Sequence, residues 1–116
     1  MYQIQAKVTK IEPTETSGVV FVYFSNKDSE LRLEIPEKIN YFKIDDEVAI
    51  RFVESDNVED DDRLFVLGYI FSNKIDEKDH RIVHISIGGL GFKLIFNNSD
   101  EIPILKPKRD IYIGFK

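Results

Sequence analysis

The sequence contains no cysteine, no long apolar run and no apolar stretch at its amino-terminal end. Without cysteine, disulfide bridges and thiolate chemistry are excluded, which fits a reducing compartment. No run approaches the roughly 20 apolar residues that cross a bilayer as a helix. The opening MYQIQAKVTK is polar at every second residue, unlike a secretory signal. We therefore expect a cytoplasmic protein with no membrane segment.

Positive charge is also in short supply. Lys and Arg total 16 against 21 Asp and Glu, which gives a net charge of −5. Proteins that coat nucleic acids usually carry a basic surface, so this balance argues against that class, although it leaves room for a local basic patch. The length of 116 residues suits one domain, and an apolar fraction of 42% is enough for a core. We expect one domain spanning residues 1–116.

Hydrophobic residues recur with a period of two along most of the chain, which predicts β-strands. The expected strands cover residues 4–12, 19–25, 31–35, 47–54, 63–73, 81–96 and 110–116, the sixth of these being open to division in two. Polar turns separate them. Seven to eight short strands in one small domain favour an antiparallel barrel or sandwich, and a closed barrel leaves no free edge. Between Pro36 and Asp46 we expect an irregular crossover whose Ile39, Phe42 and Ile44 cover one barrel end.

Catalytic chemistry is not indicated anywhere in the chain. His80 and His84 are four residues apart on a predicted strand or its start, and no third metal ligand lies nearby. GGLG is not followed by the Lys-Ser/Thr pair or the helix of a phosphate-binding loop. No serine has a recognisable base as partner. We expect no metal, no cofactor and no enzymatic activity of the chain itself.

Two charged stretches stand out. ESDNVEDDD, from Glu54 to Asp62, carries six acids in nine residues but lacks the central glycine and the spacing of a calcium loop. It predicts a solvated, mobile loop between two strands, with a basic partner surface as the less favoured alternative. The second stretch holds Lys106, Lys108 and Arg109. It predicts a scattered basic rim, with a single-strand nucleic-acid surface as the alternative.

Gly88-Gly89 interrupts the alternation of HISIGGLGFKLIF. Apolar residues occupy odd positions up to Ile87 and even positions from Leu90. A two-residue hairpin turn or a β-bulge would each produce this change of phase. We favour a bulged, bent strand, because the long strand over residues 63–73 with its own central Gly68 needs an equally long neighbour. Gly68 should lie roughly opposite the start of the glycine pair.

The same segment carries a family resemblance. LFVLGYIF, a short polar loop, VHISIGGLGFKLIF and the terminal DIYIGFK together resemble the eighth common subunit of cellular DNA-directed RNA polymerases, known in archaea as the G subunit. Gly68 matches the first glycine of the family pattern. The second block is matched by Gly88, Gly89, Leu90, Lys93 and Leu94. Ile87 and Gly91-Phe92 depart from it. The short acidic loop and the short chain point to an archaeal member.

The resemblance implies a small barrel of the oligonucleotide/oligosaccharide-binding type that serves as a non-catalytic assembly subunit. Its partners would be the largest polymerase subunit, on which it docks, and the rest of the complex, with direct nucleic-acid contact absent or peripheral. Gly88, Gly89, Leu90 and Lys93 are then the expected interface residues; equally, the glycines would serve only to close the barrel. The alternative function is a free-standing single-strand nucleic-acid-binding module of the same fold, which would need exposed aromatics beside Lys106, Lys108 and Arg109.

Overall fold

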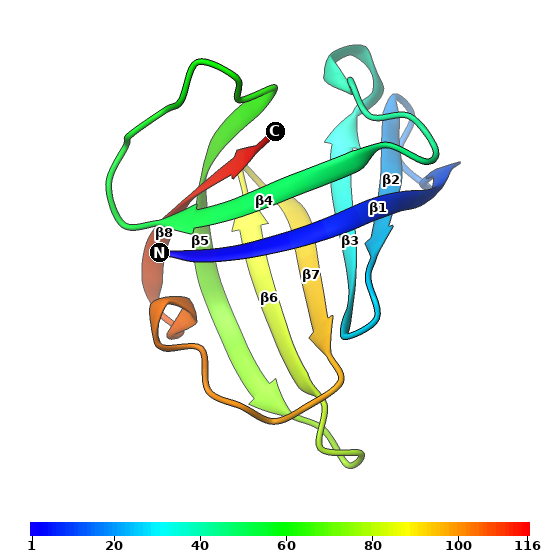
Figure 1. Cartoon of the computed structure of the whole chain (residues 1–116). Coiled ribbons are helices and arrows are strands. Elements are labelled where there is room, and N and C mark those ends of the chain that lie inside the picture. Colours follow the sequence, from blue (N-terminus) through cyan, green and yellow to red (C-terminus); the bar gives the residue numbers. More distant parts are fainter.

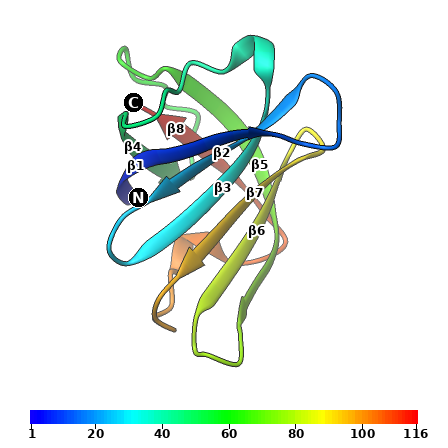
Figure 2. The same cartoon turned by 90° about the vertical axis from the view of Figure 1, so that its right-hand side faces the viewer.

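The computed structural model describes residues 1–116 as eight β-strands closed into one antiparallel barrel (Figures 1 and 2). The expected all-β class and closed barrel are confirmed. The two helical elements are single 3-10 turns, and neither is long or apolar enough to cross a membrane. The strands are β1 (Tyr2–Pro13), β2 (Val19–Ser25), β3 (Ser29–Pro36), β4 (Glu47–Val53), β5 (Leu64–Ile75), β6 (Arg81–Ile87), β7 (Leu90–Phe96) and β8 (Arg109–Phe115), and the turns are η1 (Glu37–Ile39) and η2 (Pro103–Leu105).

Two three-stranded meanders supply most of the barrel wall. The strands follow one another around the barrel in the order β1-β2-β3-β7-β6-β5-β8-β4, and β4 pairs with β1 to close it. β3 pairs with β7, so the meanders β1-β2-β3 and β5-β6-β7 lie side by side through strands far apart in sequence. β8 fits between β4 and β5. Every strand thus has two hydrogen-bonded neighbours, as closure requires.

The core follows from the alternation in each strand. β2 and β3, for example, place every second residue inside the barrel, and β3 buries Leu31, Leu33 and Ile35. Phe42, from the crossover after η1, packs edge-on against Phe24 with ring centroids 5.3 Å apart. It therefore covers one barrel end, as predicted. Ile39 and Ile44 do not, because 44% and 57% of their surfaces are exposed.

Gly88-Gly89 forms a hairpin turn, so the predicted bulge at this position is wrong. Ile87 pairs with Leu90, and the two glycines between them have φ values of +58° and +88°. Positive φ at both central positions is the requirement of a type I′ turn, whose twist suits a two-residue hairpin. A built Cβ on either glycine would meet no atom within 4 Å. The turn thus needs glycine for its backbone conformation and not for space.

The long β5 does not need an equally long neighbour, because the barrel staggers its strands. Its first part, Leu64–Ile70, pairs with β8, and Tyr69–Ile75 pairs with β6. The bulge lies on β5 itself, between Ile70 and Ser72. Tyr69 pairs with Ser86, two residues before the glycine turn. Gly68 precedes Tyr69 on the antiparallel strand, so it lies one step closer to the turn, as expected. A Cβ on Gly68 would approach Ile85 Cγ2 to 2.6 Å, which explains the glycine.

Candidate partner-binding surfaces

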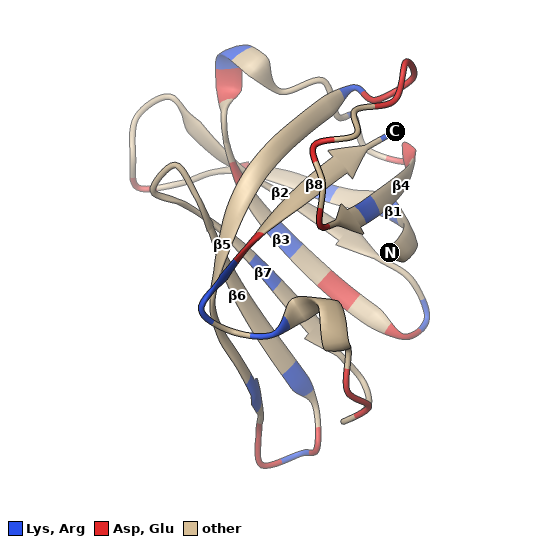
Figure 3. Ribbon diagram, turned by 90° about the vertical axis from the view of Figure 1, so that its left-hand side faces the viewer, with Lys and Arg blue, Asp and Glu red and all other residues tan.

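An apolar ridge runs along the outer face of β5 beside β8. We define this β5 ridge as Phe65, Leu67, Tyr69 and Tyr112. Leu67 and Tyr69 are 48% and 43% exposed, although alternate residues of the same strand are buried. The rings of Phe65 and Tyr112 stack with centroids 5.7 Å apart. Between Leu64 and Asn73, β5 has no charged residue, and Figure 3 shows this length of the strand as uncharged. Exposed apolar patches of this kind are typical of interaction surfaces.

The four residues expected at the interface do not share one face. Gly88 and Gly89 lie exposed at the tip of the β6–β7 hairpin. Leu90 follows on the same side as the buried Phe92, at the barrel end, and is half-buried. Lys93 faces outward. The turn is nevertheless close to the β5 ridge, because Ser86, the cross-strand partner of Tyr69, is two residues before Gly88.

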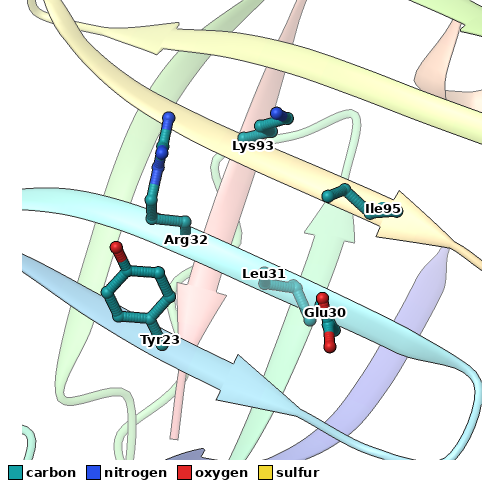
Figure 4. Close-up of a pocket in the computed structure, with 6 residues that line it drawn as sticks. All are labelled: Tyr23, Glu30, Leu31, Arg32, Lys93 and Ile95. Carbon is teal, nitrogen blue, oxygen red and sulfur yellow. The ribbon is translucent and has the colours of Figure 1, made fainter. Parts of the chain in front are cut away.

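Lys93 belongs to a row of basic side chains on the outer wall. Arg32 on β3 is its cross-strand partner on one side and His84 on β6 its partner on the other. Tyr23 is next to Arg32 on β2. Figure 4 shows Arg32 and Lys93 side by side above a hollow that is also lined by Tyr23, Leu31, Ile95 and Glu30. No carboxylate lies within 4.0 Å of the charged nitrogens of Arg32 or Lys93. We call Arg32, Lys93 and His84 the basic row.

His84 ends this row against an aromatic ring. Its Nδ1 is 3.0 Å from the hydroxyl oxygen of Ser72, and its ring stacks on Phe71 with centroids 5.6 Å apart. Burial lowers the pKa of the imidazole, and the positive charges of Lys93, Arg32 and Lys74 lower it further. The neutral form is therefore favoured at neutral pH. Phe71 itself is 53% exposed.

A second charge cluster lies on β4, and there the charges are neutralised. Arg51, only 3% exposed, donates hydrogen bonds of 2.8 Å from both terminal nitrogens to the two carboxylate oxygens of Asp62. Its third contact is the carbonyl oxygen of Asn57, 3.2 Å away. Glu59 lies 3.6 Å from Arg51 Nε and also pairs with Lys116. The predicted solvated loop from Glu54 to Asp62 is thus anchored at its end by a buried ion pair.

Sequence patterns did not predict this anchor, although one signal for it was present. Gly114 is the β8 partner of Arg51, and a Cβ there would lie 2.8 Å from the guanidinium nitrogens. A glycine in a terminal apolar strand beside an outward arginine indicates space reserved for a large side chain. The hydrogen bonds from Arg51 lower the pKa of Asp62, which helps keep the carboxylate ionised.

The remaining candidates stay apart. His80 lies 3.8 Å from Asp76 in the β5–β6 loop, whereas His84 lies on β6 beside Ser72. No group of three or more His, Asp or Glu side chains is placed to hold a metal ion. Lys106, Lys108 and Arg109 line the approach to β8, where the Lys108 amide donates a 2.6 Å hydrogen bond to the Ile70 carbonyl. This bond brings the basic rim close to Phe71.

Comparison with known protein families decides the assignment. The family model that describes the G subunit of DNA-directed RNA polymerase matches residues 1–116, the whole chain. The chain belongs to this family. No individual curated protein matches it. The resemblance carried by Gly68, Gly88, Gly89, Leu90 and Lys93 is therefore confirmed at the level of the family, and the chain is a subunit of a DNA-directed RNA polymerase.

Proposed function

We propose that the protein is a non-catalytic assembly subunit of an archaeal-type, cytoplasmic RNA polymerase and that it docks on the largest subunit. Membership of the polymerase G-subunit family is the observation that carries this proposal. The β5 ridge also supports it, because a protein without a partner would be expected to bury such exposed apolar side chains.

The docking surface that we propose combines the β5 ridge with the neighbouring glycine turn. Leu67 and Tyr69 would be buried against the partner, and apolar and aromatic side chains of this kind dominate the centres of protein interfaces. Gly88 and Gly89 carry no side chain, so a partner can approach their backbone closely. The β5 ridge would therefore supply the apolar area that is buried on docking, and the glycine turn would let the partner pack closely against its backbone.

Co-purification of polymerase subunits with the tagged chain from its native cells tests the proposal. The wild-type chain is expected to bring down the largest subunit together with the others, identified by mass spectrometry. The double variant Leu67→Ser/Tyr69→Ser should lower the recovered polymerase at least tenfold, because interface centres carry most of the binding energy. Its melting temperature should change little, because both side chains are about half exposed in the free barrel.

Two further variants sharpen the test. Ile39→Ser/Tyr41→Ser removes exposed apolar side chains from the crossover and should leave recovery unchanged. Gly88→Asn adds a side chain to the turn at a φ of +58°, which asparagine tolerates in type I′ turns. It should weaken recovery without lowering stability. Failure to recover any polymerase with the wild-type chain would refute the assembly function, and equal loss from both double variants would refute this docking surface.

A further inference from the structure

The basic row places like charges directly opposite each other, at a cost to the barrel. Arg32 and Lys93 are cross-strand partners, whereas His84, on the other side of Lys93, is neutral and adds no charge. Pairs of like charge in this position destabilise a sheet. The nearest acids on β3 do not relieve them. Glu34 accepts a 2.7 Å hydrogen bond from the Gly91 amide, and Glu30, which lines the same hollow, forms no ion pair.

The overall acidity of the chain does not provide the row with a partner. Acidic residues outnumber basic ones by 21 to 16, yet the basic row has no acidic partner. Some outward cations have an acid beside them, since Lys10 lies 3.1 Å from Glu12 and Arg63 lies 3.1 Å from Asp46, whereas Lys74 and Arg109 form no ion pair. What distinguishes Arg32 and Lys93 is that two unpaired cations lie directly opposite each other, which leaves the pair available to an external anion.

Aromatic rings flank the row on both sides. Phe71 continues it onto β5, with one face of its ring against His84 and 53% of its surface exposed. On the other side, Tyr23 is the β2 partner of Arg32, and the guanidinium of Arg32 lies over the Phe21 ring, 4.7 Å from its centroid. Phe21 and Tyr23 are half-buried, so Phe71 is the ring that remains open for stacking. Cations beside an open ring suit phosphates beside a base. An acidic peptide would use the cations but would have no need of the rings.

We propose that the basic row binds a short segment of single-stranded nucleic acid. Arg32 and Lys93 contact phosphates, and a base stacks on the exposed face of Phe71. Three strand spacings separate β3 from β5, about 14 Å in all, so the row accommodates only a few phosphates. Binding is consequently weak and sensitive to salt, as suits a peripheral contact within a larger assembly. The row is separate from the β5 ridge, although Phe71 adjoins both.

Fluorescence anisotropy with the full 116-residue chain tests this site. The probe is a labelled oligouridylate of about 12 nucleotides, titrated at about 50 mM and about 200 mM salt. The wild-type chain is expected to bind at low salt and to bind at least several-fold more weakly at high salt. An unlabelled duplex of equal length should compete poorly, because its bases cannot stack on Phe71.

Three variants locate the binding. Arg32→Ser/Lys93→Ser should weaken binding about tenfold or more and reduce the logarithmic salt slope by about 1.4, or about 0.7 for each lost contact. Lys38→Ser/Lys43→Ser removes the same charge from the exposed crossover and should have little effect. Phe71→Leu should weaken binding roughly fivefold or more with an unchanged salt slope, because a lost stacking contact releases no counterions.

Several outcomes would overturn the proposal. The first is that the wild-type chain does not bind the oligouridylate at low salt. The second is that Lys38→Ser/Lys43→Ser weakens binding as much as Arg32→Ser/Lys93→Ser does. The third is that the duplex binds as tightly as the single strand. Equally tight binding of polyglutamate would assign the row to an acidic protein segment instead. The result is distinct from the assembly function, since Arg32→Ser, which leaves Lys93 in place, should still recover polymerase in the co-purification. Loss of polymerase with that variant would assign the row to subunit docking.

Discussion

Arg51 and Arg32 both point outward from strands of the same barrel, but their surroundings differ. Arg51 is covered by the loop from Glu54 to Asp62 and makes two 2.8 Å hydrogen bonds to Asp62. Arg32 is exposed, and its cross-strand partner is Lys93. The first arginine holds a loop in place, and the second is free to bind something else. Residue type alone therefore does not separate structural charges from binding charges; the separation depends on whether a carboxylate is placed within reach.

The largest effect is expected from breaking the Arg51–Asp62 pair. Asp62→Ala leaves the buried guanidinium without its main partner, which should lower the free energy of unfolding by about 3 kcal/mol. Chemical denaturation measures this loss. Asp60→Ala in the same loop is the control, because Asp60 is exposed and forms no ion pair. A loss below about 1 kcal/mol for Asp62→Ala would show that the pair does not stabilise the barrel through this loop.

A methyl group at Gly114 should disturb the same pair less severely. The Cβ of Gly114→Ala would lie 2.8 Å from the Arg51 guanidinium, which is clamped by Asp62 and has nowhere to move. We expect a loss of about 1–3 kcal/mol, as for other overpacked sites. Gly91→Ala is the matched control: its Cβ would meet Glu34 Oε1 at 2.7 Å, but one hydrogen bond from the Gly91 amide is all that holds this side chain, so it can rotate away. Equal losses would contradict the comparison.

Acid should remove the stabilisation that the Arg51–Asp62 pair provides. The hydrogen bonds from Arg51 hold the pKa of Asp62 below its ordinary value of 3.8. The stabilisation is therefore present above that value and is lost as the pH falls through the lower folded-state pKa. Melting temperatures measured downward from neutral pH should fall less steeply below about pH 4 in Asp62→Asn than in the wild type. Asp60→Asn should retain the wild-type slope.

The smallest effect, and one of opposite sign, is expected in the basic row. Lys93→Met removes the charge opposite both Arg32 and His84 and should stabilise the barrel by about 0.2–1 kcal/mol at low salt. It should also raise the pKa of His84, since the charge of Lys93 is one of its lowering influences. An NMR titration of the imidazole measures this. Lys38→Met, at the crossover, should change neither quantity. A destabilised Lys93→Met barrel would mean that Lys93 has a structural role.

The barrel was predictable because its main signal is local. Side chains alternate across a strand, so Leu31, Leu33 and Ile35 indicate one buried face without any knowledge of their neighbours. The hairpin at Gly88-Gly89 was not predictable, because a turn and a bulge change the phase of alternation in the same way. Only the staggering of β5 between β8 and β6 shows that β5 does not require a long, bent partner.

The candidate surfaces were predictable to a smaller extent. Lys93 was expected at an interface through the family resemblance, but its neighbours Arg32 and His84 are 61 and 9 positions away in the chain and meet it only through strand pairing. Leu67 and Tyr69 lie in a long apolar run, in which no alternation marks one face as outward. Their exposure follows from which side of β5 faces the barrel interior. The sequence pattern does not show that no other segment of the chain covers the outer face of β5.

The sequence by itself determined the alternating strands, the change of phase at the glycine pair and the family, since each depends on the order of residues along the chain. Only the tertiary structure decided that Arg51 is neutralised and Arg32 is not. Both arginines occupy outward positions on alternating strands. The difference arises because the acidic loop after β4 folds back over Arg51, whereas closure of the barrel brings β7 and its Lys93 beside Arg32. Charge pairing between distant segments depends on three-dimensional proximity, which alternation along one strand does not encode.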